Sequence, residues 1–136
     1  MAERNISPEL KKNYQIVDDY CKGELRAMPD RLGYAEIYTA DAMLKSLDGQ
    51  KLQRLIRDIE IDDMANLAVG LSGDVRKWVF SNMSVRLAVK IIDVIKAKGV
   101  YDVVNDKSLK MARDGADAIL QIFIDLSKQG EFDVPS

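Results

Sequence analysis

The chain has 136 residues, 20 Lys and Arg against 22 Asp and Glu, a net charge of −2 and one cysteine. This length predicts a single domain that buries about two thirds of its unfolded surface on folding. The balanced charge argues against a nucleic-acid-binding protein, and the lone Cys21 excludes an intramolecular disulfide and is typical of a reducing compartment.

The start of the chain is too polar for a signal peptide, and no apolar run approaches the roughly 18 residues of a membrane span. We therefore expect a cytoplasmic protein that does not insert directly into a membrane.

The first predicted element is a helix over residues 8–27. Ser7, Pro8 and Glu9 supply a capping hydroxyl, a proline at the first helical position and an acid in the first turn. A proline and a glycine within residues 28–33 end this helix and mark the one plausible internal boundary. Apolar residues of this helix recur at spacings of three and four, which predicts that one face docks on the rest of the protein, with Cys21 buried. That face is formed by Leu10, Tyr14, Val17, Cys21 and Leu25.

Shorter amphipathic helices are predicted next. They cover residues 40–46, 49–59, 63–71, 74–81 and 85–98. Thr39, Asp48 and Asp62 are the expected caps of the first three. Most of these helices are too short to be stable alone, so tertiary packing must hold them.

A loop over residues 99–107 precedes the last predicted helix, at 108–129, and contains the only short run with a strand-like pattern, at 100–104. One face of the last helix is apolar. It is formed by Leu109, Ala112, Ala116, Ile119, Leu120, Phe123 and Leu126. The predicted fold is therefore all-α, a compact bundle of about six or seven short helices with an extra helix at the N-terminus.

The sequence gives little support for catalysis. It contains no histidine, no phosphate-binding loop and no Gly-x-Ser-x-Gly motif. One cysteine without histidine also argues against a zinc site. The acidic run Asp58, Glu60, Asp62 and Asp63 lacks the spacing of a calcium loop, so helix capping is favoured over cation binding. We expect a non-enzymatic protein without a metal or another cofactor.

The predicted helix after Ser84 is the candidate functional element. Its apolar residues cover more than the one stripe that a surface helix needs. The polar residues share one net-basic ridge, at spacings of four, three and three. They are Arg86, Lys90, Asp93 and Lys96. Two interpretations stay open, a partner-binding surface and a ridge that only keeps a buried helix soluble.

A sharp corner at Ser81-Asn82-Met83-Ser84 separates two of the predicted helices. Ser84 can cap the second of them, and Asn82 tolerates the backbone of a corner. The Asn-Met-Ser-x-Arg pattern with its apolar helix resembles the C-terminal domain of the flagellar motor switch protein FliG. The resemblance runs from Leu55 to Gly99 and resumes over residues 122–132, so that roughly residues 40–134 are covered.

The resemblance implies a helical domain of the flagellar motor switch that works through protein–protein contacts at the cytoplasmic face of the inner membrane. Its expected partners are other rotor switch proteins and the cytoplasmic loop of the stator. In the family, the ridge of the helix after the corner meets the stator. We expect an N-terminal helical extension at residues 1–36 and the FliG-like domain at 37–136, in a stand-alone or divergent homologue. An adaptor or scaffold that kept the fold without a motor role is the alternative.

The charges of the family are only partly present in this chain. Arg86 matches the Arg of the corner motif, and Asp93 matches the first of two paired acids. The second acid is Val94 here, a Lys before the corner falls on Val69, and Lys107 is the nearest cation beyond the helix. At two further positions that are charged in the family, this chain has Val89 and Ile92. Because steering depends on the number of charges, we expect a weakened contact with the stator.

Overall fold

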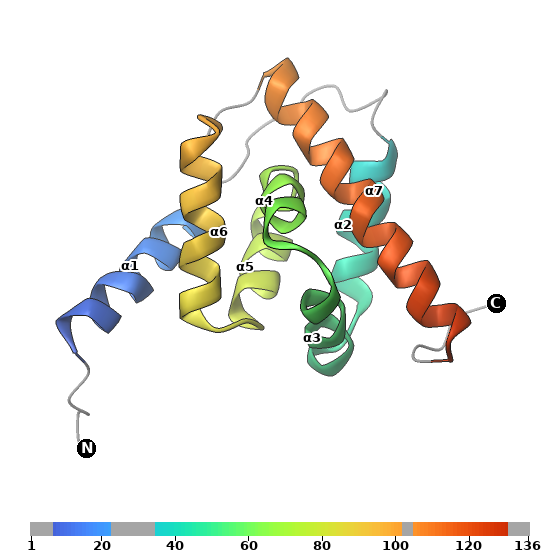
Figure 1. Ribbon diagram of the computed structural model, residues 1–136, viewed down its shortest axis with the longest axis horizontal. Helices are drawn as coiled ribbons and strands as arrows, with labels where there is room; N and C mark the ends of the chain where they lie inside the picture. The colour runs from blue at the N-terminus through green and yellow to red at the C-terminus, as the bar shows by residue number, and fades with distance from the viewer. Residues whose placement is uncertain (1–6, 23–34, 102–104, 131–136) are drawn as a thin grey trace.

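The computed structural model describes residues 7–22, 35–101 and 105–130, and every regular element in these ranges is a helix. The described helices are α1 (Pro8–Lys22), α2 (Ala35–Ser46), α3 (Gly49–Asp58), α4 (Ile61–Val69), α5 (Gly73–Ser81), α6 (Val85–Ala97) and α7 (Asp106–Lys128) (Figure 1). The prediction of an all-α fold with an extra N-terminal helix is confirmed.

Helix α4 forms the centre of the molecule. It packs against α6 on one side and α7 on the other, while α2 packs against α7 and α1 lies outside, against α5 and α6 (Figure 1). Every residue from Met64 to Val69 is buried. A nine-residue helix is marginal alone, so this burial on both sides is what stabilises α4.

Two glycines allow α4 and α7 to approach closely. A Cβ atom on Gly115 of α7 would lie 2.1 Å from the backbone nitrogen of Leu67, and one on Gly70 would lie 2.6 Å from Cβ of Ala112. Both distances are far below van der Waals contact. Glycine at these positions therefore sets the separation of the two helices.

Local capping follows the sequence at several helix ends. The Ser7 hydroxyl accepts a hydrogen bond from the Leu10 N–H at 3.1 Å, and the Asp48 carboxylate accepts one from the Lys51 N–H at 2.9 Å. Helix α7 begins two residues earlier than predicted because Asn105 caps it, accepting from the N–H of Ser108 at 2.9 Å. These caps satisfy N–H groups that have no partner within the helix.

The predicted caps Thr39 and Asp62 are wrong. Helix α2 begins at Ala35, so Thr39 lies inside it and donates from its hydroxyl to the Ala35 carbonyl at 3.0 Å. Asp62 is the second residue of α4, and its carboxylate is 2.7 Å from Nζ of Lys98. Because both helices begin earlier than predicted, Thr39 and Asp62 lie within them, and the N-cap of α4 is Glu60.

The face of α1 that docks differs from the predicted one. Tyr20 is 1% exposed and is the buried residue of this helix, whereas Tyr14 is 54% exposed. Ile16 and Val17 are partly buried against the core, and Cys21 is half-buried instead of fully buried. The docked face therefore shares Val17 and Cys21 with the predicted one but is centred on Tyr20, while Tyr14 faces solvent. Leu25, the predicted helix end at 23–27 and the break at 28–33 lie outside the described residues.

Candidate functional site

The corner between α5 and α6 is held by side-chain hydrogen bonds. The Asn82 amide donates to the Trp78 carbonyl at 2.9 Å, and its oxygen accepts from Nε2 of Gln53 on α3 at 3.3 Å. Ser84 accepts from the Leu87 N–H at 3.1 Å and caps α6, as predicted. The φ of Asn82 is −103°, so the backbone is not left-handed here. Asn82 caps the end of α5 instead of tolerating an unusual conformation.

All four residues of the predicted ridge are exposed on one side of α6. They are Arg86, Lys90, Asp93 and Lys96. The opposite side is buried and packs into the core, with Ala88, Ile91, Ile92 and Ile95 at most 1% exposed. The ridge therefore presents its three cations and one acid to solvent from a helix whose other face is fixed.

The charges of the ridge are not neutralised by neighbouring side chains. Arg86, Lys90 and Asp93 form no ion pair within the described ranges. The ammonium of Lys96 lies 5.2 Å from the centre of the Tyr101 ring, a cation–π contact that leaves its charge in place. Such a surface can attract an acidic partner.

Two of the four positions where family charges are missing are buried in this protein. Val69 is 1% exposed and Ile92 is fully buried, while Val89 and Val94 are partly exposed. Lys107 lies on α7, where its Nζ donates to the carbonyl oxygen of Lys98 at 2.8 Å, and is not part of the ridge on α6. The exposed charge of α6 is therefore confined to the four residues of the ridge.

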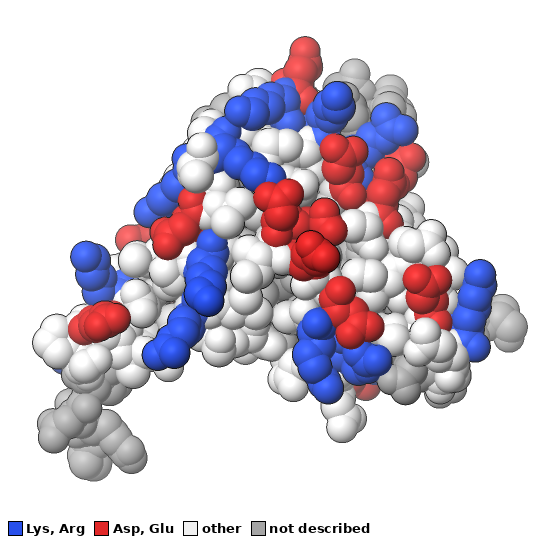
Figure 2. Space-filling view, in the orientation of Figure 1, with Lys and Arg blue, Asp and Glu red and all other residues white. Residues whose placement is uncertain are grey.

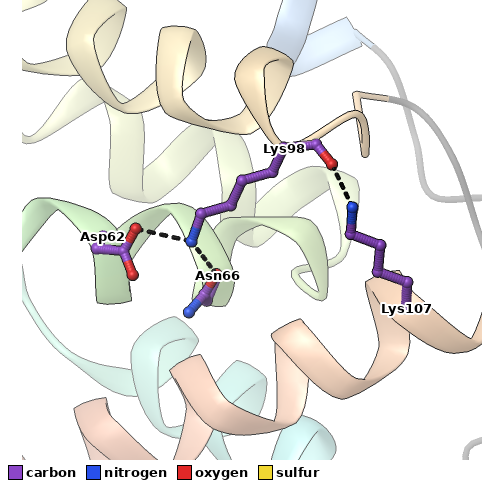
Figure 3. A network of polar contacts seen from close by, with 4 residues as sticks. All are labelled: Asp62, Asn66, Lys98 and Lys107. Atoms are coloured by element: carbon purple, nitrogen blue, oxygen red, sulfur yellow. Dashed lines mark hydrogen bonds and ion pairs between the residues drawn. The ribbon is translucent and has the colours of Figure 1, made fainter.

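The end of α6 is fastened to α4 by Lys98. Its Nζ lies 2.7 Å from an oxygen of Asp62 and donates to Oδ1 of Asn66 at 3.1 Å (Figure 3). Lys107, near the start of α7, donates from its Nζ to the backbone carbonyl oxygen of Lys98. Because α4 is the central helix, this network fixes the direction of α6 and hence of the ridge.

Helix α1 is anchored by an aromatic and cationic cluster that the sequence did not indicate. The Arg76 guanidinium lies 4.2 Å from the centre of the Tyr20 ring and donates from Nη1 to the Tyr20 carbonyl at 3.1 Å. The ring also contacts Phe80, with centroids 5.4 Å apart, and Tyr101, with centroids 5.3 Å apart. Arg76 is 1% exposed, and the carbonyl and the ring face compensate the cost of burying its charge.

An open cavity of about 430 Å³ lies between α1 and the corner. Its lining includes Val17, Cys21, Phe80 and Met83. Burial raises the pKa of the Cys21 thiol, an effect that the positive charge of Arg76 only partly opposes. The thiol is therefore protonated near neutral pH and is a poor nucleophile.

Neither a metal centre nor a membrane span is found in the part of the chain that the structure describes. No group of three or more His, Cys, Asp or Glu residues there could hold a metal ion. None of the described helices is both long and apolar enough to cross a bilayer.

The corner and α6 lie within a stretch that matches a known family. Residues 35–134 match the FliG C-terminal domain. The chain belongs to this family. FliG is a component of the flagellar motor switch, and its C-terminal domain is a structural part of that switch and not an enzyme family. Comparisons with curated proteins and with solved structures gave no match.

Membership in the FliG family assigns a role related to the flagellar motor switch and to interaction with motor proteins. The match begins at residue 35, where α2 begins, so α1 lies outside the matched residues. The division into an extension at 1–36 and a domain at 37–136 stays a prediction.

Proposed function

We propose that this protein is a component of the flagellar motor switch complex that acts through the ridge on α6. Membership in the FliG family supports the motor role. The observation that best supports the ridge as the binding site is its exposure on a helix whose opposite face is buried. The exposed residues are Arg86, Lys90, Asp93 and Lys96. An exposed net-basic ridge without internal ion pairs suits an acidic protein surface.

The proposed partners are other rotor switch proteins and, through a weaker contact, the cytoplasmic loop of the stator. The weaker contact follows from Val94, which stands where the family has a second acid. The proposed location is the cytoplasmic face of the inner membrane. An adaptor that kept the fold without a motor role is the second candidate, and the same loss of charge at Val94 and Val89 favours it.

The test is capture of partners from the native cytoplasm at low salt. The double variant Arg86→Ala and Lys90→Ala changes exposed side chains, so we expect each change to alter stability by less than about 0.5 kcal/mol. Loss of two of the three cations should reduce recovery of motor proteins and flatten its dependence on salt. Mass spectrometry of the captured proteins, beside a thermal melt, provides both measurements.

The matched control is Lys45→Ala with Lys128→Ala, which removes the same charge from exposed positions on α2 and α7. Recovery should then equal that of the wild type. Equal recovery of every partner by the ridge variant would leave the ridge as a solubilising surface. Capture of partners that are not motor proteins would favour the adaptor.

A further inference from the structure

The face that carries the ridge also carries an acidic patch. Figure 2 shows acidic side chains near the middle of this face, beside the Lys and Arg side chains along α6. The start of α4 contributes Glu60, Asp62 and Asp63. Lys98 pairs with Asp62, whereas Glu60 and Asp63 have no ion pair within the described residues. We call Glu60 and Asp63 the acidic patch; its negative charge is available to a partner.

An apolar centre lies where α4 and α6 meet. Ile61, the first residue of α4, is 38% exposed, one of the large hydrophobic side chains that remain exposed in the described ranges. It borders a narrow crevice together with Leu87 of α6, which is itself partly exposed; the other side chains that line this crevice belong to the buried core. Leu87 lies three residues before Lys90 and is its neighbour on the surface of α6, and Ile61 directly follows Glu60, the N-cap of α4, so this centre adjoins both the ridge and the acidic patch. An apolar centre with charged surroundings is the usual anatomy of a protein interface.

We propose that a second copy of this chain docks on this face. A rotation by 180° about an axis that lies in the plane of this face, between Ile61 and Leu87 and perpendicular to the line joining them, would place the ridge of each copy on the acidic patch of the other. The two contacts would be identical, as in an isologous dimer, and the two apolar centres would meet at the axis. The basic ridge and the acidic patch lie on opposite sides of the apolar centre, so each charged surface of one copy would meet the opposite charge of the other.

This inference rests on the proposed function only in taking the ridge for a contact surface. It adds that the ridge of one copy is covered by the other copy in the dimer. Motor proteins and the second copy would then compete for α6, so dimerisation would withdraw the ridge from the motor partner.

A charge-swap experiment on the full chain tests the dimer. Sedimentation equilibrium of the wild type should show a monomer–dimer equilibrium at ~0.02 M salt, with an affinity about tenfold weaker at ~0.3 M. One variant carries Arg86→Glu and Lys90→Glu, and the other carries Glu60→Lys and Asp63→Lys. Each alone should be monomeric, because like charges would face each other. A mixture of the two should dimerise again, because both contacts regain opposite charges.

Two further variants keep the result interpretable. Lys45→Glu with Lys128→Glu makes the same charge change away from this face and should dimerise as the wild type does. Ile61→Gln should weaken the dimer and leave the charges unchanged, which covers the case in which a reversal variant fails to fold in a thermal melt.

A wild type that stays monomeric at ~1 mM protein and ~0.02 M salt would overturn the proposal. A dimer that survives both reversals and Ile61→Gln would also overturn it. The result is distinguishable from that for the motor role, because the variant Glu60→Lys and Asp63→Lys keeps the ridge. It should still capture motor proteins, whether or not it dimerises.

Discussion

Tyr20 is the side chain that connects α1 to the rest of the protein. It lies among Arg76, Phe80 and Tyr101, and its own backbone carbonyl accepts a hydrogen bond from Arg76. Tyr14, on the same helix, is 54% exposed. The two tyrosines therefore form a matched pair in which only one is buried.

We predict that Tyr20→Ala lowers the free energy of unfolding by about 3 kcal/mol or more. Removal of a buried aromatic ring leaves a cavity, and the Arg76 guanidinium loses the ring over which it lies. Tyr14→Ala should change it by less than about 0.5 kcal/mol. Urea unfolding of both variants and the wild type measures the difference. Equal losses for the two variants would contradict the packing of α1 described above.

At the scale of the elements, the contact between α4 and α7 depends on the absence of a side chain. Gly115 lies inside α7, where alanine would ordinarily stabilise a helix by about 1 kcal/mol. Here a Cβ atom would lie 2.1 Å from a backbone nitrogen and 2.5 Å from Cα of Leu67. Backbone atoms cannot turn aside as the end of a side chain can, so the helices would have to separate.

We therefore predict that Gly115→Ala destabilises the protein by about 2 kcal/mol or more, because overpacking exceeds the gain in helix propensity. Gly130, just after α7, is not a suitable control. No atom lies within 4 Å of an ideal Cβ there, but its φ of +79° is a left-handed conformation that favours glycine. Asp114→Ala, next to Gly115 and exposed, is the better control and should change stability by less than about 0.5 kcal/mol. A stable Gly115→Ala variant in thermal and urea melts would disprove the close approach.

At the scale of the whole molecule, α1 lies outside the residues that match the family and still contributes to the core. Tyr20 is buried in the same cluster as residues of α5 and α6. The family-matched part retains α2 to α7, so it includes the α4 contacts with α6 and α7. Helix α1 therefore acts as a structural addition to a domain that has its own centre.

Deletion of residues 1–33 should give a folded protein with a melting temperature lower by roughly 10 °C or more. Loss of Tyr20 exposes Phe80 and Tyr101 and removes the carbonyl that binds Arg76, and each kcal/mol corresponds to a few degrees at this size. Circular dichroism melts of the deletion variant and the full chain measure the shift. An unchanged melt would show that α1 adds no stability, and an unfolded product would show that the matched part needs α1 to fold.

The sequence by itself determined the features that depend on neighbouring residues. Capping by Ser7, Asp48 and Ser84 involves groups three residues apart, and helical periodicity placed the four ridge residues on the exposed side of α6. The joint order of the corner motif and the weaker similarities over residues 55–99 and 122–132 indicated the FliG family, which the match over residues 35–134 confirms. Whether the ridge binds a partner stays a prediction.

Only the tertiary structure decided which face of α1 docks, because two adjacent stripes of that helix are apolar enough and the choice depends on residues far along the chain. Arg76 is 56 residues from Tyr20, and no local pattern indicates that this arginine is buried. The ion pair of Asp62 likewise depends on a distant residue, Lys98, which follows α6. The close approach at Gly115 has the same cause, since the space available to a side chain is set by another helix.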